Sequence, residues 1–452
     1  MTVCAGPAVA ADLPDRAAIR PLALGMPRVL STHPTVVESA SEGLLGLPCI
    51  LSPSGDWQQQ ALPWSFRLEQ PAWVLLSVQP FKDAGIDDSW QLLPHGVVWR
   101  FLGSARFQGD LLYAKRCEPG VVRIPGHGGR SPHGFRGRPH LVLIAQEMPA
   151  PPQPGQDRTA LLAEQQRIES IELASGSLRA TVQLKPALRL TAFSGGDGRQ
   201  LLAQPNADPC GIRTWVMEPF QTPRSPLPSN RRARCLERDP ARLLVTTDAD
   251  PVSGLELVWD VRLEADRLIL RHGLRNQGAA VRRLAIWSLV AGADPLAMRS
   301  VLVRSPGMPA PAMALHPMAK DASAEAGPVI EPLPAAMPGC LDLEDGVVID
   351  GPARAGRWPC KAGLRSPDGI AALALGSQAL VSRVAAPGDG PYPEGGLNLT
   401  SYHSETVIEI EHVGPLVDLA PGSSTWMEQE LVLRDLPGHA PAGLPRLLAS
   451  RA

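Results

Sequence analysis

The stretch that decides the fold reads Val407-Ile408-Glu409-Ile410-Glu411-His412-Val413-Gly414-Pro415-Leu416. Apolar and polar residues alternate along it, which is the pattern of a half-buried β-strand. Because successive side chains of a strand lie on opposite faces, Glu409 and Glu411 share one face, and Ile408 and Ile410 share the other. We therefore expect Ile408 and Ile410 in a core, and Glu409 and Glu411 at the floor of a ligand groove.

The composition favours a globular all-β protein. The chain has 452 residues, which predicts two or three domains. Its 48 prolines and 42 glycines, with few long helical patterns, indicate many turns between short strands. The formal net charge of −2 gives no basic field for nucleic acid or an anionic membrane surface. No apolar run is long enough to span a bilayer.

The first residues and the cysteines bear on the compartment. The triplet Ala8-Val9-Ala10 has the small-x-small pattern that precedes signal cleavage, so we expect a signal remnant and a secreted or periplasmic protein. A plain cytoplasmic N-terminus is the alternative. Seven cysteines include no C-x-x-C metal pair. Cys210 with Cys235 and Cys340 with Cys360 are candidate bridges in an oxidising compartment, and buried free thiols are the alternative.

Turn signals and strand patterns divide the chain into five parts. We expect a signal remnant and irregular arm over residues 1–30, a β-sandwich over 31–147, a Pro-rich linker over 148–158, a second domain over 159–438 and a tail over 439–452. Within the second domain, residues 255–263, 267–274 and 281–290 are predicted to form a meander of three long strands. Residues 303–340 have little periodicity, which is typical of a functional loop or an insert.

The first domain contains a strand pattern from Trp64 to Val74, then Trp90 in the following loop, and later Pro119-Gly120-Val121-Val122-Arg123-Ile124-Pro125-Gly126. In this order they loosely resemble a small sandwich module of secreted bacterial carbohydrate-active proteins. Three histidines, at positions 127, 133 and 140, fall in a Gly- and Arg-rich loop. We interpret that segment as a solvated loop, with a metal or sugar rim as the alternative.

The second domain carries five motifs in a fixed order. They are Arg271 to Trp287, with its His-x-Leu-x-Asn-x-Gly core; Lys361 in Lys361-Ala362-Gly363; the turn Tyr392-Pro393-Glu394-Gly395-Gly396-Leu397-Asn398; the stretch from Ile408 to Leu416; and Leu419-Ala420-Pro421-Gly422 with Glu428 and Glu430. Over about residues 165–435, these motifs resemble those of galactose-mutarotase-like proteins. The likeness is closest to a bacterial family of unassigned function. It implies the large antiparallel β-supersandwich of the aldose 1-epimerase group, whose concave face binds sugars.

The resemblance also implies roles for individual residues. Glu411 takes the position of the carboxylate base in true epimerases, and Trp287 falls near the position of their catalytic histidine. A tryptophan can stack on a sugar face but cannot protonate a ring oxygen, which argues against standard mutarotase chemistry. The segment from Gly211 to Pro219 stands where the group has an aromatic substrate loop, and it supplies Arg213 and Trp215.

Further candidates come from the residues around the carboxylate strand. His403 and Tyr402 precede that strand and are expected on a loop that reaches a ligand, with His403 as a candidate acid beside Glu411. Arg213 and Lys361 could neutralise a uronate if the protein were a polysaccharide lyase. The substrate-binding set predicted beside the catalytic candidates Glu411 and His403 is therefore Glu409, Lys361, Trp287, Arg213, Trp215, Glu394, Asn398 and Tyr402.

Taken together, the sequence predicts an N-terminal β-sandwich followed by a galactose-mutarotase-like supersandwich. We expect the second domain to bind a carbohydrate on its concave face and not necessarily to catalyse a reaction. Two alternatives stay open. One is an epimerase-like isomerase or polysaccharide lyase with Glu411 as base, and the other is a non-catalytic structural or surface-interaction protein. No Walker loop, Rossmann glycine pattern, His-Glu-x-x-His or Gly-x-Ser-x-Gly occurs, so we expect no cofactor and no metal.

Overall fold

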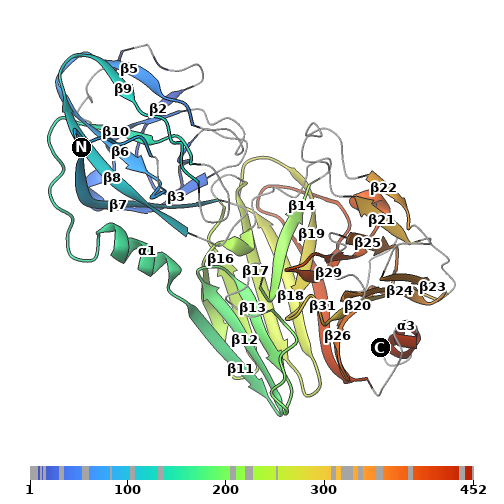
Figure 1. Ribbon diagram of the computed structural model, residues 1–452. Helices are drawn as coiled ribbons and strands as arrows, with labels where there is room; N and C mark the ends of the chain where they lie inside the picture. The colour runs from blue at the N-terminus through green and yellow to red at the C-terminus, as the bar shows by residue number, and fades with distance from the viewer. Residues whose placement is uncertain are drawn as a thin grey trace. The chain divides into compact units, whose positions relative to one another are not determined.

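The computed structural model describes residues 9–449, except 11–12, 14–16, 30–34, 53–60, 82–83, 102–106, 131–136, 204–209, 219–227, 251–252, 307–311, 317–328, 334–338, 352–359, 385–389 and 437–442. The described strands form antiparallel sheets, which confirms the predicted all-β class (Figure 1). The chain divides into two compact units, residues 1–167 and 168–452.

The first unit contains two sheets. The strands of the larger sheet lie in the order β2 (Ala18–Pro21), β4 (Pro48–Leu51), β10 (Leu141–Ala145), β6 (Ala72–Val78), β8 (Phe107–Cys117), β7 (Gln91–Phe101) and β3 (Thr35–Ala40). The smaller sheet consists of β1 (Val9–Ala10), β5 (Trp64–Leu68) and β9 (Gly120–Ile124). A 3-10 turn, η1 (Glu42–Leu44), precedes β4. Strand β2 lies in the segment that we expected to be an irregular arm.

The Pro-rich segment belongs to the first unit. Ser41 Oγ donates to the Gln156 carbonyl at 2.7 Å, so this segment is tied down rather than free. Helix α1 (Arg158–Gln166) follows, with Asp157 as N-cap accepting from the Ala160 amide at 3.0 Å. Arg158 Nη1 reaches the Gly109 carbonyl at 3.1 Å. The division between the units therefore falls after α1, and not at residues 148–158 where we expected it.

The predicted solvated histidine loop is partly wrong, because two of its histidines are buried. His127 is 0% exposed and His140 is 1% exposed, and their rings lie 5.5 Å apart. Their Nε2 atoms lie 3.1 Å from the carbonyls of Gln79 and Ala84 respectively. Burial lowers the pKa of His140 to about 3, so it packs as a neutral ring. His133 lies outside the described residues.

Two large sheets form the second unit. One has eleven strands: β11 (Glu169–Ser175), β12 (Leu178–Lys185), β13 (Arg189–Ser194), β14 (Ile212–Met217), β19 (Arg282–Ala291), β29 (Ile408–Val413), β28 (Leu399–His403), β25 (Cys360–Leu364), β21 (Met313–His316) and β22 (Val329–Pro332) in that order, with β30 (Val417–Leu419) paired to β19. The other has ten: β15 (Ala233–Arg238), β16 (Arg242–Thr247), β17 (Leu255–Leu263), β18 (Leu268–Asn276), β31 (Ser424–Asp435), β27 (Gln378–Arg383), β26 (Ile370–Leu375), β20 (Arg299–Val303), β24 (Gly346–Asp350) and β23 (Cys340–Leu343).

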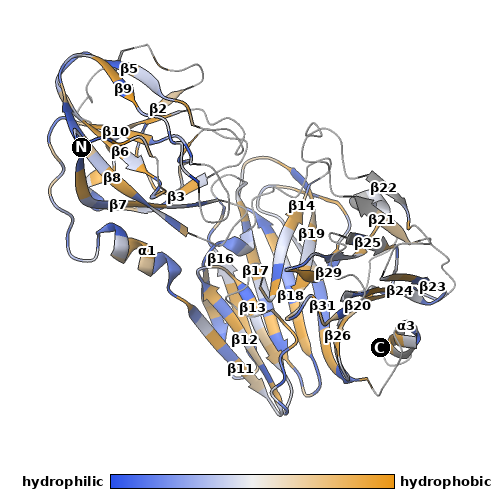
Figure 2. Ribbon diagram, viewed as in Figure 1, coloured by the Kyte–Doolittle hydropathy of each residue, from blue (hydrophilic) through white to orange (hydrophobic). Residues whose placement is uncertain are grey.

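The main core of the second unit lies between these two sheets. Leu257, Trp259 and Val261 are all 0% exposed, as the alternation along β17 predicts, and Ile408 and Ile410 join the same cluster from β29. Hydrophilic and hydrophobic residues alternate along many of these strands (Figure 2). Alternation of this kind leaves one face of each sheet for the core and the other for solvent or a ligand.

The predicted meander of three strands is wrong in its last member. Strand β18 pairs with β17 and β31, whereas β19 leaves that sheet and pairs with β14 and β29 in the other one. The side chains of β19 from Leu284 onward are buried, which suits the middle of the eleven-stranded sheet. Asn276 secures the crossing, since its Nδ2 donates to the carbonyls of Ala280 and Leu419 at 2.8 and 2.9 Å.

The predicted tail contains a packed helix. In α3 (Leu444–Ala449), Leu444 and Leu448 are 4% and 2% exposed and join a cluster with Val301, Val348 and Ala372 on the outer face of the ten-stranded sheet (Figure 1). The insert over residues 303–340 contributes the hairpin β21–β22, which extends the eleven-stranded sheet beyond β25. The rest of its middle lies outside the described residues.

The described cysteines do not form the bridge considered for Cys210 and Cys235, because both are free thiols. The Cys360 side chain lies outside the described residues, so its pairing with Cys340 stays a prediction. Within the described part of the chain, no helix is long and apolar enough to cross a membrane.

Candidate functional site

Strand register brings the predicted carboxylates together with five other candidates on one face of the eleven-stranded sheet. Across the strands, Ala291, Glu409, Tyr402 and Lys361 form one row, and Arg213, Leu289, Glu411, Thr400 and Gly363 form the next. Trp215, Trp287 and Val413 form a third row. Residues opposite each other on paired antiparallel strands share a face, so all three rows lie on the face turned away from the core. We call it the site face.

Glu411 is the most densely contacted carboxylate on the site face. Its Oε2 atom lies 3.0 Å from Lys361 Nζ, accepts from Trp287 Nε1 at 3.0 Å and accepts from Thr400 Oγ1 at 2.9 Å. The Glu411 side chain is only 3% exposed, so these contacts compensate for the loss of water. Thr400 is a site residue that the sequence analysis missed. Its position could have been inferred from the strand register, because Thr400 lies opposite Glu411 when Tyr402 lies opposite Glu409.

Glu409 is paired differently. Its Oε1 atom accepts from Arg213 Nη2 at 2.5 Å, and the two side chains are 6% and 4% exposed. Burial raises the pKa of Glu409, against the lowering effect of the Arg213 charge, and the nearby Glu411 charge raises it further. The two carboxyls of the strand thus have distinct partners, one guanidinium and one ammonium.

Two tryptophans lie beside these ion pairs. The rings of Trp215 and Trp287 meet edge to face, with centroids 5.2 Å apart. Arg213 Cζ lies 4.7 Å from the centre of the Trp215 ring, and Lys361 Nζ lies 5.1 Å from that of Trp287. These tryptophans belong to a small apolar cluster with Met217, Leu289 and Val413 that is separate from the main core. The site face therefore combines an aromatic part and a charged part.

The other predicted binding residues differ in their positions. Tyr402 lies on the site face, half-buried, and burial raises the pKa of its phenol. Asn398 instead fastens the backbone, since its side chain accepts from the Ser366 amide and donates to the Ser366 carbonyl, each at 2.7 Å. Glu394 lies in the turn η3 (Glu394–Gly396), and its side chain is outside the described residues.

The structure does not bring His403 to the site face. His403 lies within β28 rather than on a loop, and its neighbour Tyr402 occupies the position opposite Glu409. Side chains alternate along the strand, so His403 points into the core, where it is 0% exposed and its Nε2 lies 2.8 Å from Ser300 Oγ. As a buried core histidine it is not positioned to act across a ligand from Glu411.

A polar seam runs through the core directly behind the site face. Its members are hydrogen-bonded in sequence across both sheets: Trp259, Thr214, His272, Gln429, Ser382 and His412, with Ser288 also on Gln429. His272 is 0% exposed and contacts Thr214 and Gln429 at 2.7 and 2.8 Å, as expected of a hydrogen-bonded core histidine. Burial lowers the pKa of His272 to about 4 and that of His412 to about 3.

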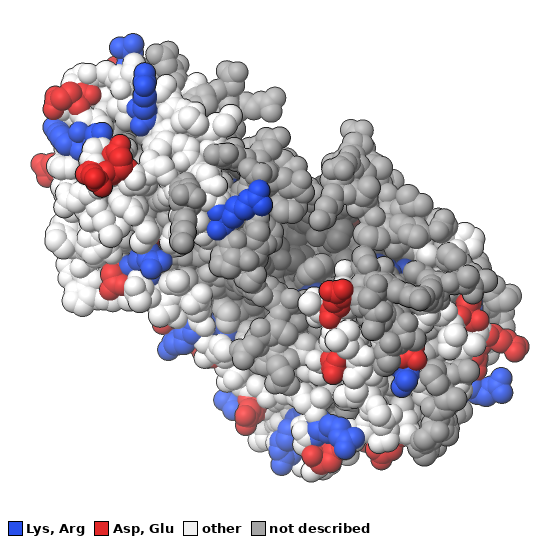
Figure 3. All heavy atoms as spheres, viewed as in Figure 1, with Lys and Arg blue, Asp and Glu red and all other residues white. Residues whose placement is uncertain are grey.

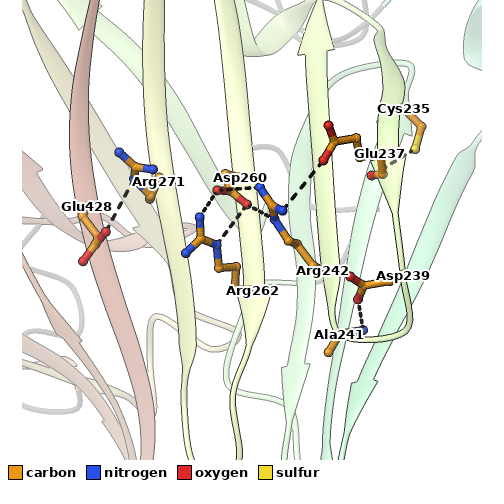
Figure 4. Close-up of polar contacts among 9 residues, drawn as sticks. All are labelled: Cys235, Glu237, Asp239, Ala241, Arg242, Asp260, Arg262, Arg271 and Glu428. Atoms are coloured by element: carbon orange, nitrogen blue, oxygen red, sulfur yellow. Dashed lines mark hydrogen bonds and ion pairs between the residues drawn. The ribbon is translucent and has the colours of Figure 1, made fainter.

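The outer face of the ten-stranded sheet is a solvated contrast to the site face. Asp260 accepts from Arg242 at 3.0 Å and from Arg262 at 2.5 Å, and Arg271 pairs with Glu428 at 3.5 Å (Figure 4). Trp426 is 44% exposed on this face. Figure 3 likewise shows positive and negative side chains interspersed on the described part of the second unit that faces the viewer. The exposed pair Arg271–Glu428 contributes little to stability, whereas the Asp260 side chain is only 5% exposed between its two arginines.

The described residues contain no group of three or more His, Cys, Asp and Glu side chains that could hold a metal ion.

The chain was compared with known proteins by sequence and by structure. No family model and no curated protein matches the sequence.

Solved structures do match the chain. The chain is similar to a putative aldose 1-epimerase from Escherichia coli K12, with a TM-score of 0.44 and 14% identity over 60% of this chain and 100% of that chain. It is similar to a galactose mutarotase-like protein from Lactobacillus casei ATCC 334, with a TM-score of 0.44 and 11% identity over 59% and 100%. It is also similar to galactose 1-epimerase from Lactobacillus acidophilus NCFM, with a TM-score of 0.40 and 11% identity over 60% and 95%.

Proposed function

We propose that the second unit binds a carbohydrate on the site face. The observation that carries this proposal is the placement of Trp215 and Trp287 directly beside the ion pairs Arg213–Glu409 and Lys361–Glu411. A sugar ring has an apolar C–H face and a rim of hydroxyl groups. An indole ring stacks against the first, and charged donors and acceptors hydrogen-bond the second.

The arrangement also has the composition expected of a small-molecule site. Such sites are lined mainly by apolar and aromatic side chains, with a few polar groups that fix the orientation of the ligand. Here the apolar cluster of Met217, Leu289 and Val413 supports the tryptophans, and four charged groups lie on β14, β29 and β25 of the same sheet. The sequence motifs around Lys361 and Glu411 resemble those of sugar-binding mutarotase-like proteins, which supports the same ligand class.

We favour binding over turnover because of what surrounds Glu411. Mutarotation requires an acid that faces the base across one sugar ring. Among the side chains that the structure describes, no histidine lies on the site face, and Trp287 occupies the position near which the resemblance implies one. The Oε2 atom of Glu411 already accepts three contacts, from Lys361, Trp287 and Thr400.

The experiment is a glycan-binding and turnover screen on the wild-type protein, on Glu411→Gln and on Glu428→Gln. Glu428 is an exposed glutamate on the outer face of the other sheet, so its variant is a matched control. We expect the wild type and Glu428→Gln to bind the same glycans without turnover, and Glu411→Gln to lose most of that binding. Unchanged binding by Glu411→Gln would place the sugar elsewhere, and efficient anomer interconversion by the wild type would favour the epimerase alternative.

A further inference from the structure

The site face contains buried hydrogen-bond donors that lack an acceptor. Within the described residues, Arg213 Nε, Arg213 Nη1 and Trp215 Nε1 are all inaccessible to solvent and make no hydrogen bond. Arg213 as a whole is 3% exposed. The two side chains are neighbours on β14, with the guanidinium stacked 4.7 Å from the centre of the Trp215 ring. These three donors therefore form one cluster.

Burying these three donors without an acceptor costs free energy. A buried N–H group without a partner loses its hydration and gains nothing in return, and the penalty is larger when the group is charged. Arg189, which is 5% exposed in the same unit, donates to the carbonyls of Leu188 and Ser229 and to Asn230 Oδ1. Arg299 and Arg383 each leave one buried nitrogen without a hydrogen bond, whereas Arg213 leaves two. The contrast at Arg213 indicates a position prepared for a ligand.

The unpartnered atoms on the site face are of one kind. Among the described side chains of this face, every buried polar atom without a partner is a donor, and none is a carboxylate or hydroxyl oxygen. A hydroxyl group of a neutral sugar can donate or accept, whereas a carboxylate only accepts and has two oxygens to do so. An anionic oxygen group, which only accepts, therefore matches this set of donors better than a neutral hydroxyl group does.

Charge balance favours a single negative charge. With Glu409 and Glu411 ionised, the charges of Arg213 and Lys361 leave the site face neutral. One added negative charge is offset if Glu409 takes up a proton, and the raised pKa of Glu409 acts in that direction. Arg213 would then form its ion pair with the ligand instead of with Glu409. A dianion such as a phosphate ester would keep one uncompensated negative charge.

We propose that the carbohydrate of the site face is an acidic one, a uronic acid residue whose carboxylate binds Arg213 and Trp215 Nε1. This inference rests on the proposed function and narrows its ligand class. A sulfate ester presents the same single charge and acceptor oxygens, so the test must separate the two sources.

The test uses calorimetric titration of the full chain at pH 7. The probes are trimers of galacturonate, glucuronate and mannuronate, the methyl esters of each, and a neutral galactose trimer with and without a 6-sulfate. The variants are Arg213→Lys, which keeps the positive charge beside Glu409, and Trp215→Phe, which keeps the ring but removes the indole N–H. Trp426→Phe, on the outer face of the ten-stranded sheet, is the matched control. Circular dichroism and thermal unfolding establish that each variant is folded.

We expect at least one uronate trimer to bind on the order of tenfold or more tightly than its methyl ester, since the ester loses the charge. Arg213→Lys should reduce that preference about tenfold, Trp215→Phe several-fold, and Trp426→Phe should leave it unchanged. Equal affinity for acids and esters would overturn the inference while leaving the proposed function intact. Binding of only the sulfated trimer would overturn the carboxylate assignment. If no glycan of the panel binds, the proposed function fails as well.

Discussion

Glu411 and Lys361 form an ion pair that is almost fully removed from water, with side chains 3% and 14% exposed. A pair of this kind contributes modestly as a whole, because desolvation of both charges offsets their attraction. Removing one partner is a different matter, since the other charge then stays buried and uncompensated. Unfolding of variants of this pair therefore measures its contribution to stability separately from any effect on glycan binding.

At this scale we predict that Lys361→Met lowers the free energy of unfolding by about 3–5 kcal/mol, because it leaves the Glu411 carboxylate buried without its cation. Adding Glu411→Gln to the same chain should recover most of that loss. Urea unfolding of the two single variants and the double variant measures this. A double variant whose loss equals the sum of the two single losses would show that the pair is not coupled.

Sequence alternation alone predicts which residues of the carboxylate strand share a face, because the period of a strand is two. It correctly places Glu409 with Glu411 and Ile408 with Ile410. It cannot place Trp215 against Trp287, since that contact depends on pairing β14 with β19, which lie about seventy residues apart in the sequence. The error over His403 has the same origin: residues expected on a loop form β28, and alternation within β28 then turns His403 to the core.

At the scale of elements, the polar seam joins the two sheets through side chains that must stay neutral. His272 has a pKa of about 4 in the folded chain against an ordinary value of 6.5. As the pH falls below 6.5 the unfolded chain takes up a proton before the folded chain does. The stability due to neutral His272 is therefore fully present above pH 6.5 and is lost progressively between pH 6.5 and about 4.

We predict that His272→Gln flattens this part of the pH profile. The wild type should lose up to about 1.4 kcal/mol per pH unit from His272 in that window, and the variant should lack this contribution. Urea unfolding of both proteins at pH 7.5, 6.0 and 5.0 gives the two slopes. Parallel slopes for the wild type and the variant would mean that His272 does not titrate as the buried seam requires.

Helix α3 is the second element with a direct test. Leu448 is 2% exposed against the outer face of the ten-stranded sheet, so Leu448→Ala should cost about 2–4 kcal/mol of stability. Leu296→Ala, at an exposed leucine of the same unit, is the control and should change little. Thermal and urea unfolding compare them. A negligible effect of Leu448→Ala would show that the C-terminal segment does not pack as a helix on this sheet.

The sequence could not reveal α3, because six residues are too few for a clear helical period and their apolar side chains read equally well as a tail. The same holds for the crossing of β19 to the other sheet. Its pattern predicts a long strand, but only the pairing of its neighbours decides which sheet it enters. Strands were thus predictable from local pattern, and their partners were not.

At the scale of the whole molecule, the chain consists of two units with separate cores. We predict that residues 1–167 fold on their own, and that residues 1–150, which lack α1, are less stable. Helix α1 packs on the first unit through Arg158 and the Gly96 backbone, where a side chain on Gly96 would clash with Arg158. Unfolding of the two fragments compares them. Equal stability of the two fragments would show that α1 does not stabilise the first unit, and would place the domain boundary in the Pro-rich segment.

The measurement that tests the central claim most directly is a crystal structure of the full chain with a bound glycan from the screen. We predict the sugar on the site face, with one ring stacked on Trp215 or Trp287, hydroxyl groups on Glu411 or Lys361, and an acidic group on Arg213. Trp426 and the outer face of the ten-stranded sheet should carry none. A glycan bound on the first unit or on that outer face, with the site face unoccupied, would contradict the assignment.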